Sequence, residues 1–157
     1  RNQRLIASFT DSVASKPKLY IDNIKIEHNS KNFITISPSS VWFTKQYPKE
    51  LWIEFINKVP QDFDIFLLGS PADKSYNHEI MDSSSRKDGI FNKAGELSLL
   101  QSAALMKQAL MNYVNDSAPL HLCSAVNAPV CVMYCSTLPA FGFGPLSDKS
   151  YILETEE

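Results

Sequence analysis

The feature that most constrains the fold of this chain is a repeated alternation of short apolar runs with longer amphipathic runs from residue 32 onward. Short apolar runs bounded by turn residues are typical of buried strands, and amphipathic runs of about ten residues are typical of helices that cover a sheet. Strands and helices that alternate in this order build a parallel sheet with helices on its faces. The pattern therefore predicts an α/β protein.

The pattern predicts five strands and four helices, arranged as a Rossmann-like, doubly wound parallel sheet. The predicted strands cover residues 33–37, 64–68, 89–92, 110–114 and 129–134. The predicted helices cover residues 48–59, 73–84, 98–108 and 119–126, and Ser98 is expected to cap the third. Because such sheets bind ligands outside the carboxyl ends of their strands, binding residues are expected in the loops that follow the strands.

Composition narrows the class of protein. A chain of 157 residues with 44% hydrophobic content suits one packed domain. Fifteen basic and seventeen acidic residues leave a net charge of −2 without a basic block, so nucleic acid is not expected as a partner. No apolar run approaches the roughly 20 residues of a membrane span, and no signal peptide is recognisable, so a cytoplasmic protein is expected.

The three cysteines, Cys123, Cys131 and Cys135, lie in apolar surroundings and lack the paired close spacing of a zinc site. They are predicted to be buried, reduced thiols. The chain also lacks the G-x-G-x-x-G and G-x-x-x-x-G-K-[ST] phosphate-binding motifs. No metal site is expected, and any phosphate recognition must use another pattern.

The strongest candidate for a binding site is the turn after the fourth predicted strand, Asn115-Asp116-Ser117-Ala118-Pro119-Leu120-His121. The first backbone N–H groups of a helix have no acceptor within the helix and carry a partial positive charge, which suits a phosphate or diphosphate. His121, one turn into the helix, would add an imidazole donor. The alternative is structural: Asp116 or Ser117 caps the helix, and His121 packs or is solvated.

Earlier turns contribute further candidates. Thr44 and Lys45 offer a hydroxyl and a cation to a phosphate, although a lone lysine is more often solvated. Asp73 follows the second strand and is suited either to accept hydrogen bonds from ribose hydroxyls or to cap the next helix. Leu97 would either wall a base pocket or pack in the core.

Taken in order, these segments resemble glycosyltransferase family 9, the ADP-heptose:lipopolysaccharide heptosyltransferases, over about residues 33–147. The markers are Ser37-Pro38-Ser39, Thr44-Lys45-Gln46-Tyr47-Pro48, Leu68-Gly69-Ser70, Ala94-Gly95-Glu96-Leu97-Ser98-Leu99, Asn115 to His121, and Gly144-Pro145. The resemblance implies the GT-B architecture, in which an N-terminal acceptor domain faces a C-terminal donor domain. This chain would be the C-terminal half, with residues 1–31 as a linker or N-terminal extension and residues 32–157 as the donor-binding domain.

The resemblance also implies a role for each candidate. Thr44 and Lys45 would contact the donor diphosphate, Asp73 the ribose and Leu97 the adenine. The diphosphate and the heptose would be surrounded by Asp116, Ser117, Ala118 and His121. The family usually has glycine at the position of Ala118 and often has glutamate at that of Asp73.

The implied reaction is inverting transfer of heptose from ADP-heptose to the lipopolysaccharide core, with a lipid A–core oligosaccharide acceptor and no cofactor. The general base would belong to the N-terminal domain, so this chain alone is expected to bind nucleotide without catalysing transfer. The enzyme would be cytoplasmic and peripheral on the inner face of the membrane. Two alternatives stay open: a stand-alone nucleotide-binding module, and a GT-B enzyme that uses another nucleotide sugar such as a UDP-sugar.

Overall fold

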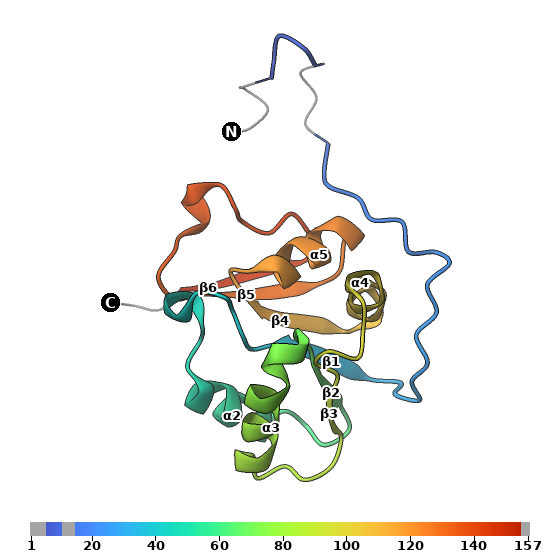
Figure 1. Ribbon diagram of the computed structural model, residues 1–157, viewed down its shortest axis with the longest axis vertical. Coiled ribbons are helices and arrows are strands. Elements are labelled where there is room, and N and C mark those ends of the chain that lie inside the picture. The colour runs from blue at the N-terminus through green and yellow to red at the C-terminus, as the bar shows by residue number, and fades with distance from the viewer. Residues whose placement is uncertain (1–5, 11–14, 155–157) are drawn as a thin grey trace.

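A parallel sheet forms the centre of the computed structural model, which describes residues 6–10 and 15–154. Its strands are β1 (Phe33–Ser37), β2 (Asp64–Leu67), β3 (Ile90–Asn92), β4 (Met111–Asn115), β5 (Val130–Tyr134) and β6 (Ser150–Glu154). They lie in the order β3-β2-β1-β4-β5-β6, and every neighbouring pair is parallel (Figure 1). The predicted Rossmann-like, doubly wound sheet is confirmed.

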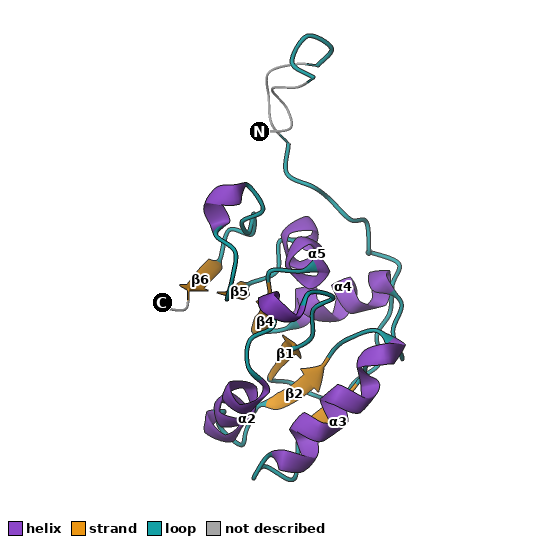
Figure 2. Cartoon of the chain, turned by 60° about the vertical axis from the view of Figure 1, so that its left-hand side comes forward, coloured by secondary structure: helices purple, strands orange, loops and turns teal. Residues whose placement is uncertain are grey.

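Two longer helices cover each face of the sheet (Figure 2). The longer helices are α2 (Lys49–Lys58), α3 (Lys74–Ser83), α4 (Leu99–Gln108) and α5 (Ala118–Val126), and the short 3-10 helices are η1 (Phe43–Lys45), η2 (Pro71–Asp73) and η3 (Pro139–Phe141). The predicted cap of α4 is confirmed, because the Ser98 hydroxyl accepts a hydrogen bond from the backbone N–H of Gln101 at 3.3 Å. The bounds of the other three longer helices differ from the predicted ones by one residue at one or both ends.

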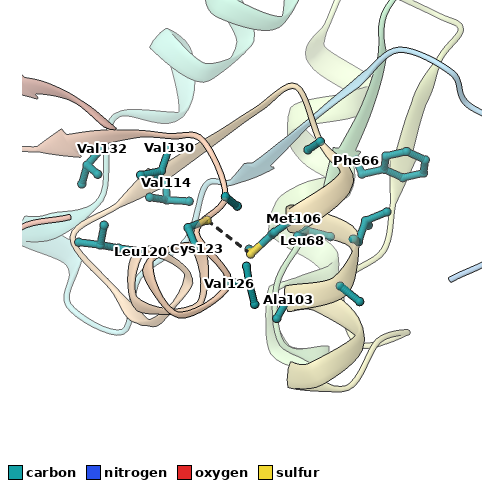
Figure 3. Packing of buried hydrophobic residues seen from close by; sticks show 14 of the residues in the cluster. Phe66, Leu68, Ala103, Met106, Val114, Leu120, Cys123, Val126, Val130 and Val132 are labelled. Atoms are coloured by element: carbon teal, nitrogen blue, oxygen red, sulfur yellow. Dashed lines mark hydrogen bonds between the residues drawn. The ribbon is translucent and has the colours of Figure 1, made fainter. Parts of the chain in front are cut away.

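The alternation of side chains along β1 divides the core into two layers. Ile34 and Ile36 point toward α2 and α3, where Trp52 is fully buried. Phe33 points toward α4 and α5, and Figure 3 shows Val114, Val130 and Val132 beside Leu120 and Cys123 of α5, with Met106 of α4 on the other side of Cys123. On that side the two helices meet at a contact of 3.7 Å between the sulfur atoms of Cys123 and Met106.

The structure corrects two details of the sequence prediction. A sixth strand, β6, pairs with β5 and was not predicted, because its five residues are exposed and follow a long loop instead of a helix. Cys135 is partly exposed, whereas Cys123 and Cys131 are buried as predicted. Burial raises the pKa of the Cys123 thiol to about 12, as expected of an inert core cysteine.

The residues before β1 also pack on this domain, through Ile21, which is 6% exposed. The backbone N–H of Leu19 donates to the carbonyl of Ala125 in α5 at 2.9 Å. Among the described residues, no helix has both the length and the apolar character of a membrane span.

Candidate functional site

The direction of the strand order reverses between β1 and β4, and Asn115 joins the loops that leave these two strands. Its buried side chain donates from Nδ2 to the carbonyl of Pro38 at 2.9 Å and accepts at Oδ1 from the backbone N–H of Tyr47 at 2.9 Å. The loop after β1 is therefore fixed against the end of β4, at the position where Rossmann-like sheets bind ligands.

A cavity of about 690 Å³ opens at this carboxyl edge of the sheet, within the size range of small-molecule sites. The loops after β1, β2, β3 and β4 and the helices α4 and α5 all contribute to it. Four predicted residues line it: Asp73, Leu97, Ser117 and Ala118. Ser37 also lines it, although its hydroxyl is buried without a hydrogen-bond partner among the described residues.

A second cavity, of about 380 Å³, adjoins the first. Among the predicted residues that line it are Lys45, Asp116 and His121. Two aromatic side chains, Trp42 and Phe143, complete its wall and are 68% and 58% exposed. This cavity is therefore polar at its base and aromatic at its rim.

The two cavities meet at the start of α5, since Ser117 and Ala118 line both of them. Ser117 occupies the N-cap position, but its hydroxyl contacts the carbonyl of Asn115 at 3.4 Å and does not cap the helix. The first turn is therefore not closed by a side-chain cap. Pro119 has no N–H and that of Leu120 donates to the carbonyl of Ser117 at 3.1 Å, so the backbone N–H groups that the start of α5 can offer to an anion are those of Ser117 and Ala118.

Lys45 and Asp116 form an ion pair at the base of the second cavity. The Lys45 Nζ lies 2.7 Å from Asp116 Oδ2, and the two side chains are 27% and 7% exposed, so Lys45 is not merely a solvated lysine. The same oxygen accepts a hydrogen bond of 2.7 Å from the hydroxyl of Thr137, which the sequence analysis did not single out. Asp116 therefore accepts from side chains in the loops after β1 and β5, and its side chain does not cap α5.

The loop after β5 is held at a second point, because the Tyr134 hydroxyl donates to the carbonyl of Phe143 at 3.3 Å. Burial, followed by the negative charges of Asp116 and Glu154, raises the pKa of Tyr134 to about 12. This phenol therefore stays protonated at neutral pH and keeps its hydrogen bond. The loop that carries Thr137 and Phe143 is therefore hydrogen-bonded at two points, and its Phe143 lines the second cavity.

The wall of the larger cavity near β2 and β3 depends on close backbone contact. Asp73 Oδ2 accepts hydrogen bonds of 2.7 Å from both the backbone N–H and the hydroxyl of Ser70, which closes a capping box on η2. Asp73 stands at the N-cap position of α3, but its side chain makes no capping hydrogen bond to that helix, and it lines the cavity. Gly95 has a φ of +76°, and a Cβ atom there would lie 2.8 Å from the Cα of Pro71. Only glycine fits this approach without displacement.

The structure gathers seven of the eight predicted site residues around the two cavities. The exception is Thr44, which is exposed on η1 and lines neither cavity. Trp42, Phe143, Ser37 and Thr137 are additions from the structure. Trp42, Thr137 and Phe143 lie in loops that follow predicted strands, and Ser37 lies in a family motif, but none of the four was predicted as a contact.

A family model described as glycosyltransferase family 9 (heptosyltransferase) matches residues 7–157. The chain belongs to this family. Among curated glycosyltransferase family 9 relatives, it is similar to lipooligosaccharide heptosyltransferase 2 of Haemophilus influenzae, with 30% identity over 101 residues, covering 63% of this chain and 29% of that protein. It is also similar to lipopolysaccharide heptosyltransferase 2 of Escherichia coli K12, with 27% identity over 112 residues and coverage of 69% and 32%. The chain spans about a third of the length of these relatives.

Solved family 9 structures share the fold. E. coli ADP-heptose lps heptosyltransferase II superposes with a TM-score of 0.69 at 26% identity, covering 80% of this chain and 39% of that one. The family 9 protein of Veillonella parvula superposes with a TM-score of 0.73 at 22% identity, covering 82% and 36%. The sheet described above is therefore one that heptosyltransferases contain as part of a longer chain.

Proposed function

We propose that this chain is the donor-binding domain of an inverting glycosyltransferase that transfers heptose from ADP-heptose to the lipopolysaccharide core. One observation carries the proposal: two adjoining cavities meet at the start of α5, beside the ion pair of Lys45 with Asp116. A nucleotide sugar has a nucleoside and a sugar on either side of a diphosphate. The two cavities lie on either side of the start of α5, so one could hold the nucleoside and the other the sugar, with the diphosphate at the helix start between them.

In the proposed arrangement the nucleoside occupies the larger cavity, with its adenine against Leu97 and its ribose near Asp73. The diphosphate lies at the start of α5, near Ser117 and Ala118. The heptose occupies the second cavity, beside Asp116 and His121. Thr44, the remaining predicted contact, would reach the diphosphate only if η1 turned toward the cavity.

The chemistry required of this domain is electrostatic. The acceptor hydroxyl attacks the anomeric carbon, the bond from that carbon to the phosphate oxygen breaks, and ADP leaves with an added negative charge. Backbone N–H groups of α5 and the ammonium of Lys45 would stabilise that charge as it develops. The general base would come from an N-terminal acceptor domain. Neither a metal nor a cofactor is part of the proposal, since the donor is itself a substrate.

The relatives support this substrate class. The two curated relatives are named as heptosyltransferases of lipooligosaccharide and lipopolysaccharide, and the solved E. coli relative at 26% identity is named for ADP-heptose. We therefore propose a lipid A–core oligosaccharide as acceptor, bound through another domain. A cytoplasmic enzyme that is peripheral on the inner face of the membrane would suit that acceptor.

Calorimetric titration of the chain with ADP, UDP, GDP and CMP tests the proposal. ADP should bind most tightly, because the larger cavity is assigned to adenosine. A preference for UDP would replace ADP-heptose by a UDP-sugar while keeping the donor site. Failure to bind any of the four would contradict a nucleotide-sugar site altogether. Robust transferase turnover by residues 1–157 alone would contradict the assignment of the general base to another domain.

A further inference from the structure

Thr137 lies in the loop between β5 and η3 and contacts the candidate site through a single side-chain hydrogen bond. Its hydroxyl donates to Asp116 Oδ2 at 2.7 Å, the same oxygen that Lys45 contacts at 2.7 Å. Three loops, which follow β1, β4 and β5, therefore converge on one carboxylate oxygen. This convergence joins the loop after β5 to the β4–α5 turn.

The burial of Asp116 explains why it needs both partners. Its side chain is only 7% exposed, and a buried carboxylate is costly unless it is paired and hydrogen-bonded. A carboxylate paired with one flexible lysine can rotate about its Cβ–Cγ bond, and the ammonium follows its shorter contact, that of 2.7 Å to Oδ2, over the contact of 3.5 Å to the Asp116 backbone carbonyl. A second donor from a separate loop fixes the rotation, so the position of the Lys45 ammonium is fixed as well.

The position of that ammonium matters because Lys45 is the only lysine or arginine among the described residues that line the two cavities. An ammonium has three N–H donors, and that of Lys45 contacts both Oδ2 and, at 3.5 Å, the backbone carbonyl of Asp116, so one donor stays available for a ligand. The hydroxyl of Thr137 also stabilises the negative charge of Asp116, which weakens the ion pair between Asp116 and Lys45.

We propose that Thr137 is a positioning residue of the donor site, which orients Asp116 and thereby places the Lys45 ammonium for the diphosphate. The inference rests on the proposed function, because it assumes that a nucleoside diphosphate occupies the site. The loop after β5 then takes part in diphosphate binding indirectly, because Thr137 acts through Asp116 and Lys45.

Thr137→Val keeps the size of the side chain and removes its hydroxyl, whereas Thr137→Ser keeps the hydroxyl. ADP and adenosine affinities are measured by calorimetry for both variants, with Ser136→Ala as an exposed control in the same loop. Thr137→Val should weaken ADP binding about three- to tenfold and leave adenosine binding unchanged, as expected for the loss of one hydrogen bond. Thr137→Ser should restore ADP binding to within about twofold, and Ser136→Ala should match the wild type.

A merely structural role predicts another pattern, in which Thr137→Val lowers stability and weakens ADP and adenosine binding equally. That pattern, or ADP binding that Thr137→Val does not change, would overturn the inference. Thr137→Ala, measured in the same way, must show the same selective loss if Thr137→Val folds poorly. If the wild type prefers UDP, the donor assignment fails and Thr137 is tested with UDP and uridine. A wild type that binds no nucleoside diphosphate overturns both proposals.

Discussion

Two buried charged side chains lie at opposite edges of the sheet and differ in their partners. Arg86 precedes β3 at the amino edge, is 4% exposed, and donates only to backbone carbonyls of the adjoining turns. Those carbonyls belong to Val59, Pro60, Gln61, Phe63 and Asp88. Asp116 follows β4 at the carboxyl edge, accepts from the side chains of two other loops, and lines a cavity.

The difference shows that burial of a charge does not by itself indicate function. Arg86 lines neither of the two cavities at the carboxyl edge, and its five donors all go to backbone carbonyls, of which that of Pro60 also accepts from the N–H of Phe63 at 3.2 Å. It therefore stabilises the turns that lead into β2 and β3. Asp116 and Lys45 are held by side chains in the wall of a cavity, where the ammonium can also contact a ligand. We expect Arg86 to act on folding and Lys45 to act on binding.

Arg86→Met gives the largest expected effect, a loss of about 2–4 kcal/mol in the free energy of unfolding, because a buried guanidinium and its hydrogen bonds to five backbone carbonyls are lost. Urea unfolding measures it, and Lys58→Ala on the exposed end of α2 is the control, with a change within about 0.5 kcal/mol. Arg86→Lys should recover only part of the loss, since lysine lacks the planar fork of donors. A stable Arg86→Met variant with weakened ADP binding would break the contrast between the two edges.

Lys45→Ala should weaken ADP binding about ten- to a hundredfold and leave adenosine binding nearly unchanged, because it removes a charge-assisted contact to the diphosphate. Calorimetry with both ligands measures the difference. Lys49→Ala is a matched control, since Lys49 forms an exposed pair of 3.0 Å with Glu79 on the neighbouring helices. Equal losses for ADP and adenosine would remove Lys45 from the diphosphate.

Two glycines with positive φ lie at different edges of the sheet, so alanine substitutions at them separate effects on folding from effects on binding. Gly89, with φ of +71°, lies where a Cβ would be 2.9 Å from Nη2 of Arg86, and Gly95 lies where a Cβ would meet Pro71. Alanine at either position should cost about 1–3 kcal/mol of stability. Only Gly95→Ala should also weaken ADP binding in the same calorimetric titration. Weaker ADP binding by a folded Gly89→Ala variant would mean that the edges are coupled.

Tyr134 gives the smallest expected effect, which depends on pH. Its pKa is raised from 10.0 to about 12 in the folded chain. Because the folded state holds this proton more tightly, the resulting stability is complete below pH 10 and is lost as the pH rises from 10 to about 12. Tyr134→Phe should therefore lose less stability than the wild type between about pH 8 and pH 11 in urea unfolding. An identical alkaline loss in both proteins would contradict the raised pKa.

Local pattern was sufficient to predict most of the fold. β1 occupies the predicted residues, because an apolar run is bounded by Asn32 and Pro38. The α4 cap was predictable, because Ser98 stands directly before an apolar helical stripe. β6 was not predictable in this way, since its side chains are exposed and give no alternation of buried and exposed positions.

The candidate site was predictable where its residues follow strands, as Asp116 and Asp73 do. Thr137 also follows a strand, so its loop was expected at the binding edge, but its role was not, because its contact with Asp116 spans 21 positions. Arg86 was equally hidden, since nothing in the sequence distinguishes it from Lys87, which is exposed. Such partners depend on how the loops are placed in three dimensions.

Binding of a diphosphate at the start of α5 can be followed residue by residue in an ADP titration of the isotope-labelled chain, with backbone amide NMR as the readout. We expect saturable shifts that are largest at Ser117 and Ala118, with little change at Arg86 and the turns that it joins. Shifts that are largest at the amino edge, or none that saturate, would contradict diphosphate binding at this helix start.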